Sequence, residues 1–310
     1  MKQFHNVLFV SNGLGKDTQA LQQAISLALE NNAKLSILIL CPSFPHSLED
    51  HKNSYEAFLL DKMQKSIDTA KASLSFAKKK TSFKIEIEWG DTPDIRIIQR
   101  VLRKSYDLVI KAVENKDDTK GFEALDMALL RKCPCTLFLH RPFNSTENLH
   151  IAVAIDPKDE EISGHDLALS LLKLSQALST HYNGHLSVIS CWDFILEHYL
   201  RHSVFIDTSA TEIDEMTIRE SEKQYHVLLR LIHEASIKDP TIYYQKGTPT
   251  ELIPSMVSEK KIDILIMGTV ARTGIAGFII GNTAENILQK INCSLWALKP
   301  PGFLSPVKAY

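Results

Sequence analysis

The stretch MGTVARTGIAGFIIGNTAENILQKI, at residues 267–291, has the composition of a loop that binds a phosphate group. Glycines let backbone amides approach a ligand closely, and Arg272 supplies the nearby cationic side chain. Asn282 is a favoured helix N-cap, so the N–H groups of the next helix would face an anion beside Gly281. The alternative interpretation is a mobile crossover in which the glycines only form turns. These glycines are Gly268, Gly274, Gly277 and Gly281.

Two other groups of residues are spaced so that their side chains could bind a metal. His198 and His202 stand four residues apart, which would place two imidazoles on one helix face, but Tyr199 occupies the position of the glutamate in zinc proteases. Cys133 and Cys135 form a CxC without a second pair of ligands nearby. A solvated helix and buried packing are the favoured interpretations, so we predict no metal site at these residues.

The chain shows none of the usual patterns of catalysis. It has no GxSxG, no HExxH and no Walker loop, and no histidine is placed by pattern beside a nucleophile. Asp156 and Glu285 are the available carboxylates for positioning a water near phosphates. We therefore name no catalytic residue.

The sequence contains the same series of apolar runs twice, in the same order. HNVLFV at 5–10 parallels HIAVAI at 150–155, and KLSILILC at 34–41 parallels HLSVISC at 185–191. YDLVIK at 106–111 parallels IDILIM at 262–267, and RKCPCTLFL at 131–139 parallels INCSLWALK at 291–299. Runs that are apolar on both faces indicate strands of a parallel sheet buried between helices.

Helical periodicity fills the spaces between these runs. We predict helices at 18–31, 55–80, 93–105, 121–132, 165–181, 211–236, 249–260 and 283–291. Alternation of strands and helices predicts an α/β class, with two tandem doubly wound parallel-sheet domains. The polar segment PFNSTEN at 142–148 is a plausible linker, so we place the domains at 1–143 and 149–310.

The two predicted halves differ where a ligand would bind. When Ser11 is aligned with Asp156, and Gly121 with Gly281, the loop of the first half is four residues shorter. It carries the carboxylates of Glu114, Asp117 and Asp118, which would repel a phosphate. We therefore predict a degenerate ligand site in the first half and a ligand in the second half alone.

Composition and charge limit the classes of partner. The chain has 310 residues, a formal net charge of -2, 44% hydrophobic and 23% charged residues, which give no reason to expect nucleic acid or an anionic membrane. The start, MKQFHNVLFV, has the pattern of neither a signal peptide nor a membrane span. The five cysteines lie in or beside apolar runs, which predicts reduced thiols in a cytoplasmic protein.

The tandem halves, the GxxA at Gly268 to Ala271 and the GNT at Gly281 to Thr283 resemble the universal stress protein family. Its ATP-binding members carry GxxG, nine residues, and then glycine followed by serine or threonine. Together with RKCPC, the stretch GTVARTGIAGFIIGNTAE resembles the tandem universal stress protein E subgroup. The resemblance implies a stress-response function, adenine nucleotide alpha hydrolase-like domains packed as a pseudo-dimer, and ATP or AMP as ligand of the second domain. With that ligand we expect no metal beyond a magnesium ion that accompanies ATP, and at most a weak ATPase.

The same resemblance implies roles for individual residues. Asp156 would meet the adenine, and Ser190 and Cys191 would line the base pocket. The residues expected around the ribose and phosphates are Gly268, Ala271, Arg272, Gly281, Asn282 and Thr283. Ala271 adds a Cβ where the family has glycine, and Asn282 replaces a hydroxyl residue, so nucleotide binding should be weakened.

Two further hypotheses stay open beside the nucleotide site. The segment WDFILEHYLRHSVFI at 192–206 is apolar enough to cover a core or an interface, or to line a pocket for an apolar ligand in a protein with a vestigial glycine loop. A protein that works only through interactions, without a small ligand, is the other hypothesis. The sequence does not identify the protein partners, and it leaves a homodimer open.

Overall fold

The computed structural model describes residues 4–15, 17–74, 83–114, 120–143, 148–157, 162–202, 208–269 and 280–310. The chain divides into two compact units, which are described separately. Unit 1 comprises Met1–Asn144, Thr269–Ile280 and Ser294–Tyr310, and unit 2 comprises Ser145–Gly268 and Gly281–Cys293. Unit 1 therefore contains a segment from the end of the chain.

The sheet of unit 1 has the strand order β3-β2-β1-β4-β5-β10. Its strands are β1 (Asn6–Ser11), β2 (Lys34–Cys41), β3 (Lys84–Trp89), β4 (Leu108–Ala112), β5 (Thr136–His140) and β10 (Ser294–Leu298). The first five pair in parallel, whereas β10 runs antiparallel to β5. The prediction of a parallel α/β sheet is confirmed for five strands, and β10 is the exception.

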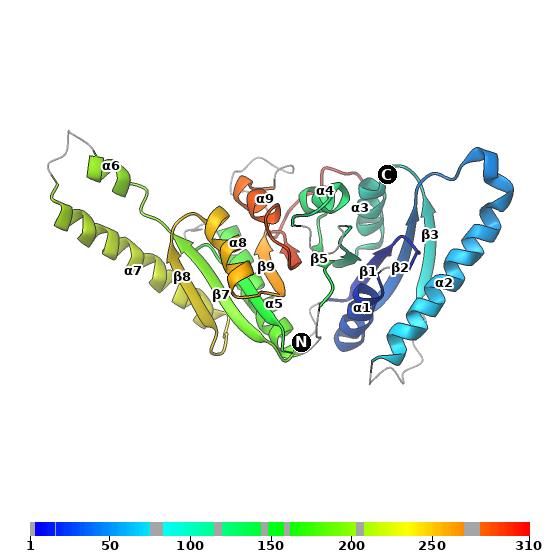
Figure 1. Ribbon diagram of the computed structural model, residues 1–310, viewed down its shortest axis with the longest axis horizontal. Coiled ribbons are helices and arrows are strands. Elements are labelled where there is room, and N and C mark those ends of the chain that lie inside the picture. The colour runs from blue at the N-terminus through cyan, green and yellow to red at the C-terminus, as the bar shows by residue number, and fades with distance from the viewer. Residues whose placement is uncertain are drawn as a thin grey trace. The chain divides into compact units, whose positions relative to one another are not determined.

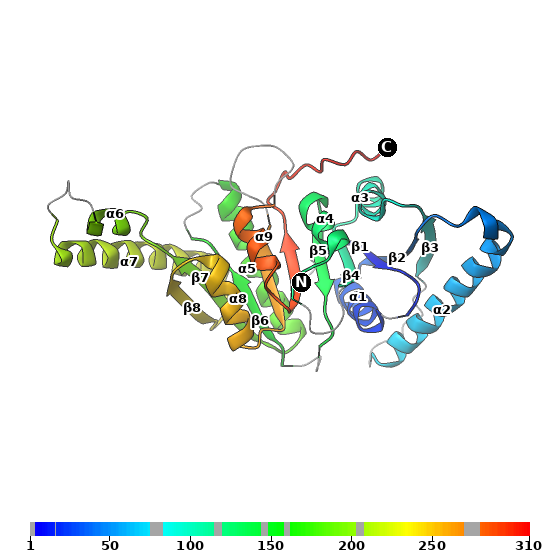
Figure 2. The ribbon, with the colours of Figure 1, turned by 45° about the horizontal axis from the view of Figure 1, so that its top comes forward.

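Helices cover the sheet of unit 1 on both faces. They are α1 (Thr18–Asn31), α2 (Lys52–Ala72), α3 (Pro93–Lys104) and α4 (Ala124–Lys132), with a 3-10 helix, η1 (His46–His51), before α2. Helix α1 contacts α2, and α3 contacts α4. Figure 2 shows α1 and α2 on one side of the sheet and α3 on the other, as a doubly wound fold requires.

Unit 2 repeats this arrangement with the strand order β9-β6-β7-β8, all parallel. Its strands are β6 (His150–Ala154), β7 (His185–Trp192), β8 (Thr241–Lys246) and β9 (Ile264–Gly268). Its helices are α5 (Ile162–His181), α6 (Glu197–His202), α7 (Ala210–Glu234), α8 (Pro249–Glu259) and α9 (Asn282–Leu288). Figure 1 shows α6 lying along the first part of α7, away from the strands.

Local sequence signals account for most helix boundaries. Pro93 and Pro249 open α3 and α8, since proline has no N–H to leave unpaired in the first turn. Helix α7 begins with a capping box, in which Ser209 and Glu212 each accept a hydrogen bond from the other's backbone N–H. The predicted helices at 18–31 and 93–105 match α1 and α3 within one residue. The predicted helix at 55–80 begins three residues after the observed start of α2 and runs into residues 75–82, which lie outside the described chain.

Sequence reasoning missed strands β3 and β8, which end the strand order of their units. Their sequences, KIEIEW and TIYYQK, mix polar and apolar residues, whereas the search was for runs that are apolar on both faces. A strand at the end of a sheet has one neighbour and stays partly exposed, so polar residues are accepted there. The alternation of charged and apolar residues in KIEIEW was the signal available.

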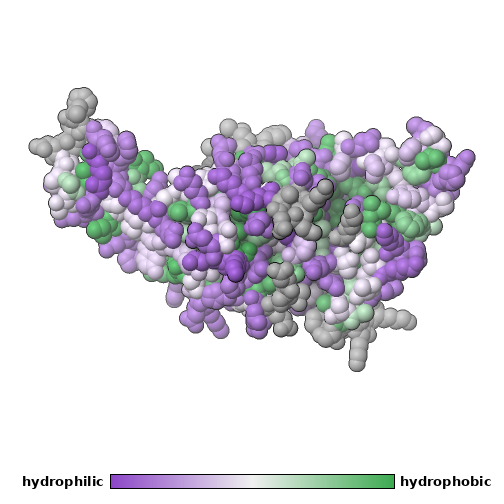
Figure 3. Space-filling view, viewed as in Figure 1, coloured by the Kyte–Doolittle hydropathy of each residue, from purple (hydrophilic) through white to green (hydrophobic). Residues whose placement is uncertain are grey.

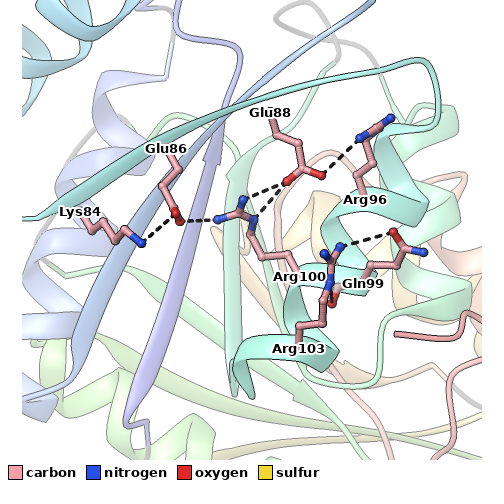
Figure 4. A network of polar contacts seen from close by, with 7 residues as sticks. All are labelled: Lys84, Glu86, Glu88, Arg96, Gln99, Arg100 and Arg103. Carbon is pink, nitrogen blue, oxygen red and sulfur yellow. Dashed lines mark hydrogen bonds and ion pairs between the residues drawn. The ribbon is translucent and has the colours of Figure 1, made fainter. Parts of the chain in front are cut away.

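Carboxylates on β3 are paired with arginines of α3. Figure 4 shows the Arg100 guanidinium between the carboxylates of Glu86 and Glu88, with Arg96 on the other side of Glu88. Arg100 Nη2 lies 3.0 Å from Glu88 Oε2, and Arg100 is 17% exposed. The hydrogen bond from Lys84, and then the charge of Arg100, hold the pKa of Glu86 below its usual range. The pair of carboxylates thus fastens α3 to the end of the sheet.

We expect Arg100→Ala to lower the free energy of unfolding of unit 1 by about 1–3 kcal/mol, since charged hydrogen bonds are lost and two carboxylates stay close together. Urea denaturation followed by circular dichroism measures this. The control is Arg103→Ala on the same helix, at an exposed position, which should change stability by less than about 0.5 kcal/mol. Equal effects of the two substitutions would show that the position of Arg100 between the carboxylates is unimportant.

Candidate functional site

Asp156 lies where β6 gives way to a loop, at the carboxyl edge of the sheet of unit 2. The backbone N–H of Ile155 donates to the carbonyl of Ile189 on β7 at 2.9 Å, which carries the strand pairing one residue past β6. Asp156 follows directly and is exposed. Open parallel sheets bind ligands at this edge, so Asp156 lies where a ligand of this fold is expected.

Ser190 and Cys191 lie near the end of the neighbouring strand, β7. Burial raises the pKa of the Cys191 thiol to about 11, and the charge of Asp156 adds to this effect. The structure therefore brings Cys191 and Asp156 into one neighbourhood, while their predicted contact with a base stays a prediction. The Ser190 hydroxyl is buried and has no hydrogen-bond partner among the described residues. A buried hydroxyl in that condition is rare, and a ligand atom could supply the missing bond.

Gly268 ends β9, and helix α5 explains why it is a glycine. A Cβ added at Gly268 would lie 2.9 Å from Leu167 Cδ2, closer than carbon atoms normally approach. The glycine therefore permits α5 to pack closely on the end of the strand. Its conformation needs no ligand, and any role in binding would come in addition to this packing.

Helix α9 begins one residue earlier than the sequence predicted. Its N-cap is Gly281, with φ -61 and ψ 138, and the N–H of Glu285 donates to the Gly281 carbonyl at 2.9 Å. The assignment of Asn282 as N-cap was wrong, because Asn282 is already the first residue of the helix. Asn282 and Thr283 are both exposed.

The remaining residues of the predicted site lie outside the described chain. Ala271 and Arg272 fall in residues 270–279, together with Gly274 and Gly277. Their predicted contacts with ribose and phosphate stay predictions. The described part of the site consists of Asp156, Ser190, Cys191, Gly268, Gly281, Asn282 and Thr283.

Hydrogen bonds identify which residues of the two units are equivalent. In unit 1 the Asp107 N–H donates to the Asn6 carbonyl, and in unit 2 the Asp263 N–H donates to the His150 carbonyl. Counting from these partners places Asn12, and not Ser11, at the position of Asp156. The alignment predicted from sequence was therefore shifted by one residue, because apolar runs match about equally well in neighbouring registers.

Hydrogen bonds also correct the alignment of the loops that precede α4 and α9. The N-cap of α4 is Glu123, whose carbonyl accepts from the Met127 N–H at 2.9 Å, as Gly281 does in α9. Glu123, and not Gly121, is the equivalent of Gly281. Ten residues separate Ala112 from Glu123 and twelve separate Gly268 from Gly281, so the loop of unit 1 is shorter by two residues instead of four.

A buried ion pair occupies the carboxyl edge of unit 1. Lys111 Nζ, on β4, lies 2.5 Å from Asp126 Oδ1, in the first turn of α4, and both side chains are almost completely buried. The backbone N–H of Glu114 donates to the other oxygen of Asp126 at 3.4 Å. Sequence reasoning missed this pair, although a lysine inside the apolar run YDLVIK was a visible signal.

Unit 2 has apolar residues in place of this ion pair. Lys111 lies four residues after Asp107, as Met267 does after Asp263, so Lys111 corresponds to Met267. Asp126 and Ala284 each lie three residues after the N-cap of their helix, so they correspond as well. Met267 and Ala284 are both buried. Of the predicted acidic residues in unit 1, burial raises the pKa of Glu114, while Asp117 and Asp118 lie outside the described residues.

The other segments noted in the sequence are partly exposed. The rings of His198 and His202 stack at 4.4 Å on α6, and His202 Nδ1 is within 2.8 Å of the His198 carbonyl oxygen. Ile195 is 79% exposed and Leu196 55%, so in the described part of 192–206 these side chains do not cover the core. In Figure 3 the region of α6 and α7 shows apolar side chains among hydrophilic ones.

The described residues contain neither a cluster of metal ligands nor a helix that could span a membrane. No group of three or more histidine, cysteine or acidic residues there is arranged to hold a metal ion. No helix in that part of the chain combines the length and apolar character that crossing a bilayer requires.

A sequence model described as the universal stress protein family matches residues 3–141 and 148–299. Universal stress protein E of Photorhabdus laumondii is 24% identical, with 100% of this chain and 99% of the relative covered. Universal stress protein E of Salmonella typhi is 26% identical, with 99% and 98% covered. A crystal structure described as a putative universal stress protein from Pseudomonas aeruginosa is similar in fold, with a TM-score of 0.71, 20% identity, and 96% of this chain and 94% of that one covered.

Proposed function

The chain belongs to the universal stress protein family, and from that premise we propose that it is a stress-response protein with one adenine-nucleotide site. The site lies at the carboxyl edge of the sheet of unit 2 and takes ATP or AMP. The first repeat, which we place at 1–143, has a structural role, and the second, at 149–310, carries the ligand. The observation that carries this proposal is the closeness of Cys191 to Asp156 at this edge, next to Ser190, whose hydroxyl has no hydrogen-bond partner among the described residues.

The contrast between the two units supports one site instead of two. In unit 1 the Lys111–Asp126 pair occupies the end of β4, and the Glu123 carboxylate stands at the N-cap of α4. A phosphate approaching that N-cap would meet a negative charge. At the equivalent positions, unit 2 has Met267, Ala284 and Gly281, none of which carries a charge.

Each residue of unit 2 contributes in a way that follows from its chemistry. Asp156 accepts hydrogen bonds from the base, and the Ser190 hydroxyl gains a partner when the base enters. Gly281, Asn282 and Thr283 hold phosphate oxygens through backbone N–H groups, an amide and a hydroxyl. Ala271 and Arg272 complete the phosphate contacts. A magnesium ion accompanying ATP would neutralise part of the phosphate charge.

The proposed activity is ligand-dependent signalling, with hydrolysis slow at most. A nucleotide stabilises whichever conformation of the protein binds it more tightly, and partner proteins then distinguish the two conformations. We place the protein in the cytoplasm, where its five thiols would stay reduced; none of them forms a disulfide in the structure.

A second candidate is a protein that binds an apolar ligand or protein partners and keeps only a vestigial glycine loop. The exposed side chains of Ile195, Leu196 and Tyr199 favour it, because large exposed apolar residues next to each other suggest a contact surface. The departures from the family pattern at Ala271 and Asn282 also favour it. The two candidates differ in whether nucleotide binds at all.

We expect isothermal titration calorimetry to detect saturable binding of ATP and AMP to the wild-type protein. Gly281→Asp should weaken ATP binding by at least about tenfold, since bringing like charges together costs several kcal/mol. The variant should fold normally, because the Gly281 backbone has φ -61 and ψ 138, which any residue adopts, and aspartate is a good N-cap.

The matched control is Glu123→Asp, at the equivalent N-cap of unit 1. It keeps the negative charge and should leave ATP binding unchanged. If ATP binding is lost in Glu123→Asp and kept in Gly281→Asp, the nucleotide binds in unit 1, which contradicts the proposal. Absence of binding to the wild type at millimolar ATP would favour the second candidate.

A further inference from the structure

Cys133 and Cys135 bring two sulfur atoms together where α4 leads into β5. Cys133 is the C-cap of α4, and its N–H donates to the Leu129 carbonyl at 2.8 Å. Cys135 stands directly before β5, separated from Cys133 by Pro134. The two Sγ atoms are 3.5 Å apart, within hydrogen-bonding contact. A disulfide bond is about 2.05 Å long, so a shift of roughly 1.5 Å would join them.

The two thiols differ in exposure. Cys133 is completely buried, whereas the residue Cys135 is partly exposed, so we assign the first contact with a small reagent in solvent to Cys135. The third cysteine of unit 1, Cys41, is buried, and Cys191 of unit 2 is partly exposed. Exposure alone therefore does not distinguish Cys135 from Cys191, but the adjacent sulfur of Cys133 does.

A partly buried cation accompanies the pair. Lys299 follows β10, and its ammonium donates hydrogen bonds to the Leu130 carbonyl and to Thr269 Oγ1, the latter at 2.8 Å. The hydrogen bond from Cys135 lowers the pKa of the Cys133 thiol, and the charge of Lys299 adds to this effect. A thiolate is the reactive form of cysteine, so Cys133 is the better nucleophile of the two.

We propose that Cys133 and Cys135 are a site of reversible oxidation, at which a hydroperoxide converts the two thiols into an intramolecular disulfide. The Cys135 sulfur attacks one peroxide oxygen, an S–O bond forms and the O–O bond breaks. The hydroxide released takes the Cys135 proton and leaves as water. Cys135 is then a sulfenic acid.

The second step closes the disulfide. The Cys133 sulfur attacks the Cys135 sulfur, the S–S bond forms and the S–O bond breaks. The departing hydroxide takes the Cys133 proton and leaves as a second water molecule. Two thiols and one hydrogen peroxide thus give one disulfide and two waters, with the peroxide as the two-electron oxidant.

The relative rates of the two steps follow from the surroundings. The interaction with Cys133, and then burial, raise the pKa of the Cys135 thiol, which slows the first step. The second step is fast, because the attacking sulfur is already 3.5 Å away. The sulfenic acid should therefore not persist, and the disulfide protects Cys135 from further oxidation.

The test treats the reduced full-length protein with hydrogen peroxide, blocks remaining thiols with iodoacetamide, and maps peptides by mass spectrometry. The peptide holding Cys133 and Cys135 should lose both alkylation sites and weigh two hydrogen atoms less. Dithiothreitol should restore both sites. In the same sample Cys191, which is partly exposed in the other unit, should give sulfenic or sulfinic acid and no intramolecular disulfide.

Two variants separate the steps. In Cys133→Ser the sulfenic acid at Cys135 should accumulate and react with dimedone, whereas Cys135→Ser should lose the disulfide without a dimedone adduct at Cys133. The proposal is overturned if both thiols of the wild type stay alkylatable at a peroxide dose that oxidises Cys191. A disulfide that joins either residue to another cysteine or to a second chain also overturns it. The wild-type measurement decides even where a variant does not fold.

Discussion

Lys111→Met is expected to lower the free energy of unfolding of unit 1 by about 3–5 kcal/mol, the usual cost of removing one partner from a buried ion pair. Lys111 Nζ lies 2.5 Å from Asp126 Oδ1, and the Asp126 side chain is 0% exposed. Without the ammonium, the carboxylate keeps one hydrogen bond, from the Glu114 N–H at 3.4 Å. Chemical denaturation measures the loss.

Unit 2 provides the matched control for this substitution. Lys111→Met combined with Asp126→Ala introduces the residues that stand at the equivalent positions, Met267 and Ala284. The double variant should recover most of the stability, because replacing both members of a buried ion pair by apolar residues is often neutral. If the double variant is no more stable than the single one, the unpaired charge is not the cause of the loss.

Trp296→Ala is expected to destabilise unit 1 by about 3–5 kcal/mol, as large-to-small changes at buried aromatic residues do. Trp296 is completely buried on β10, and its ring stacks on Phe138 of β5 at 4.6 Å and on Phe4 at 5.8 Å. Trp296 and Phe138 are direct partners in the antiparallel pairing of the two strands. Thermal unfolding followed by circular dichroism checks this result.

Trp192→Ala is the control, because it removes a tryptophan that is not completely buried. Trp192 lies in unit 2, is only partly buried, and stacks on Tyr244 with ring centroids 5.9 Å apart. Its loss should cost less than about 2 kcal/mol. A loss at Trp296 no larger than at Trp192 would mean that β10 contributes little to the core of unit 1.

Much of the fold could be predicted because its signals are local. The repeated apolar runs predicted β1, β2, β4 and β5 and their counterparts in the second half, and proline placed the starts of α3 and α8. The missed strands, β3 and β8, carry polar residues because each has a neighbour on one side only. Residue-level alignment of the halves failed by one or two positions, since neighbouring registers of an apolar run look alike in sequence.

The candidate site was predictable in part for the same reason. The end of a parallel strand is recognisable in sequence, so Asp156 could be named before its position was known, whereas Ser190 and Cys191 were named from the family resemblance. The partner of Lys111 could not be named, because Asp126 is fifteen residues away and meets it only when α4 packs on the sheet. The closeness of Cys133 and Cys135 was visible as a spacing, but the position of Lys299 was not.

The sequence by itself determined the α/β class, the duplication and the family, because these depend on patterns within short segments and on their order along the chain. Tertiary structure alone decided that an ion pair lies at the edge of unit 1, that a serine hydroxyl in unit 2 has no partner among the described residues, and that β10 joins the sheet of the first unit. Each of these depends on contacts between residues distant in sequence, whose distances are set by packing and not by local propensity.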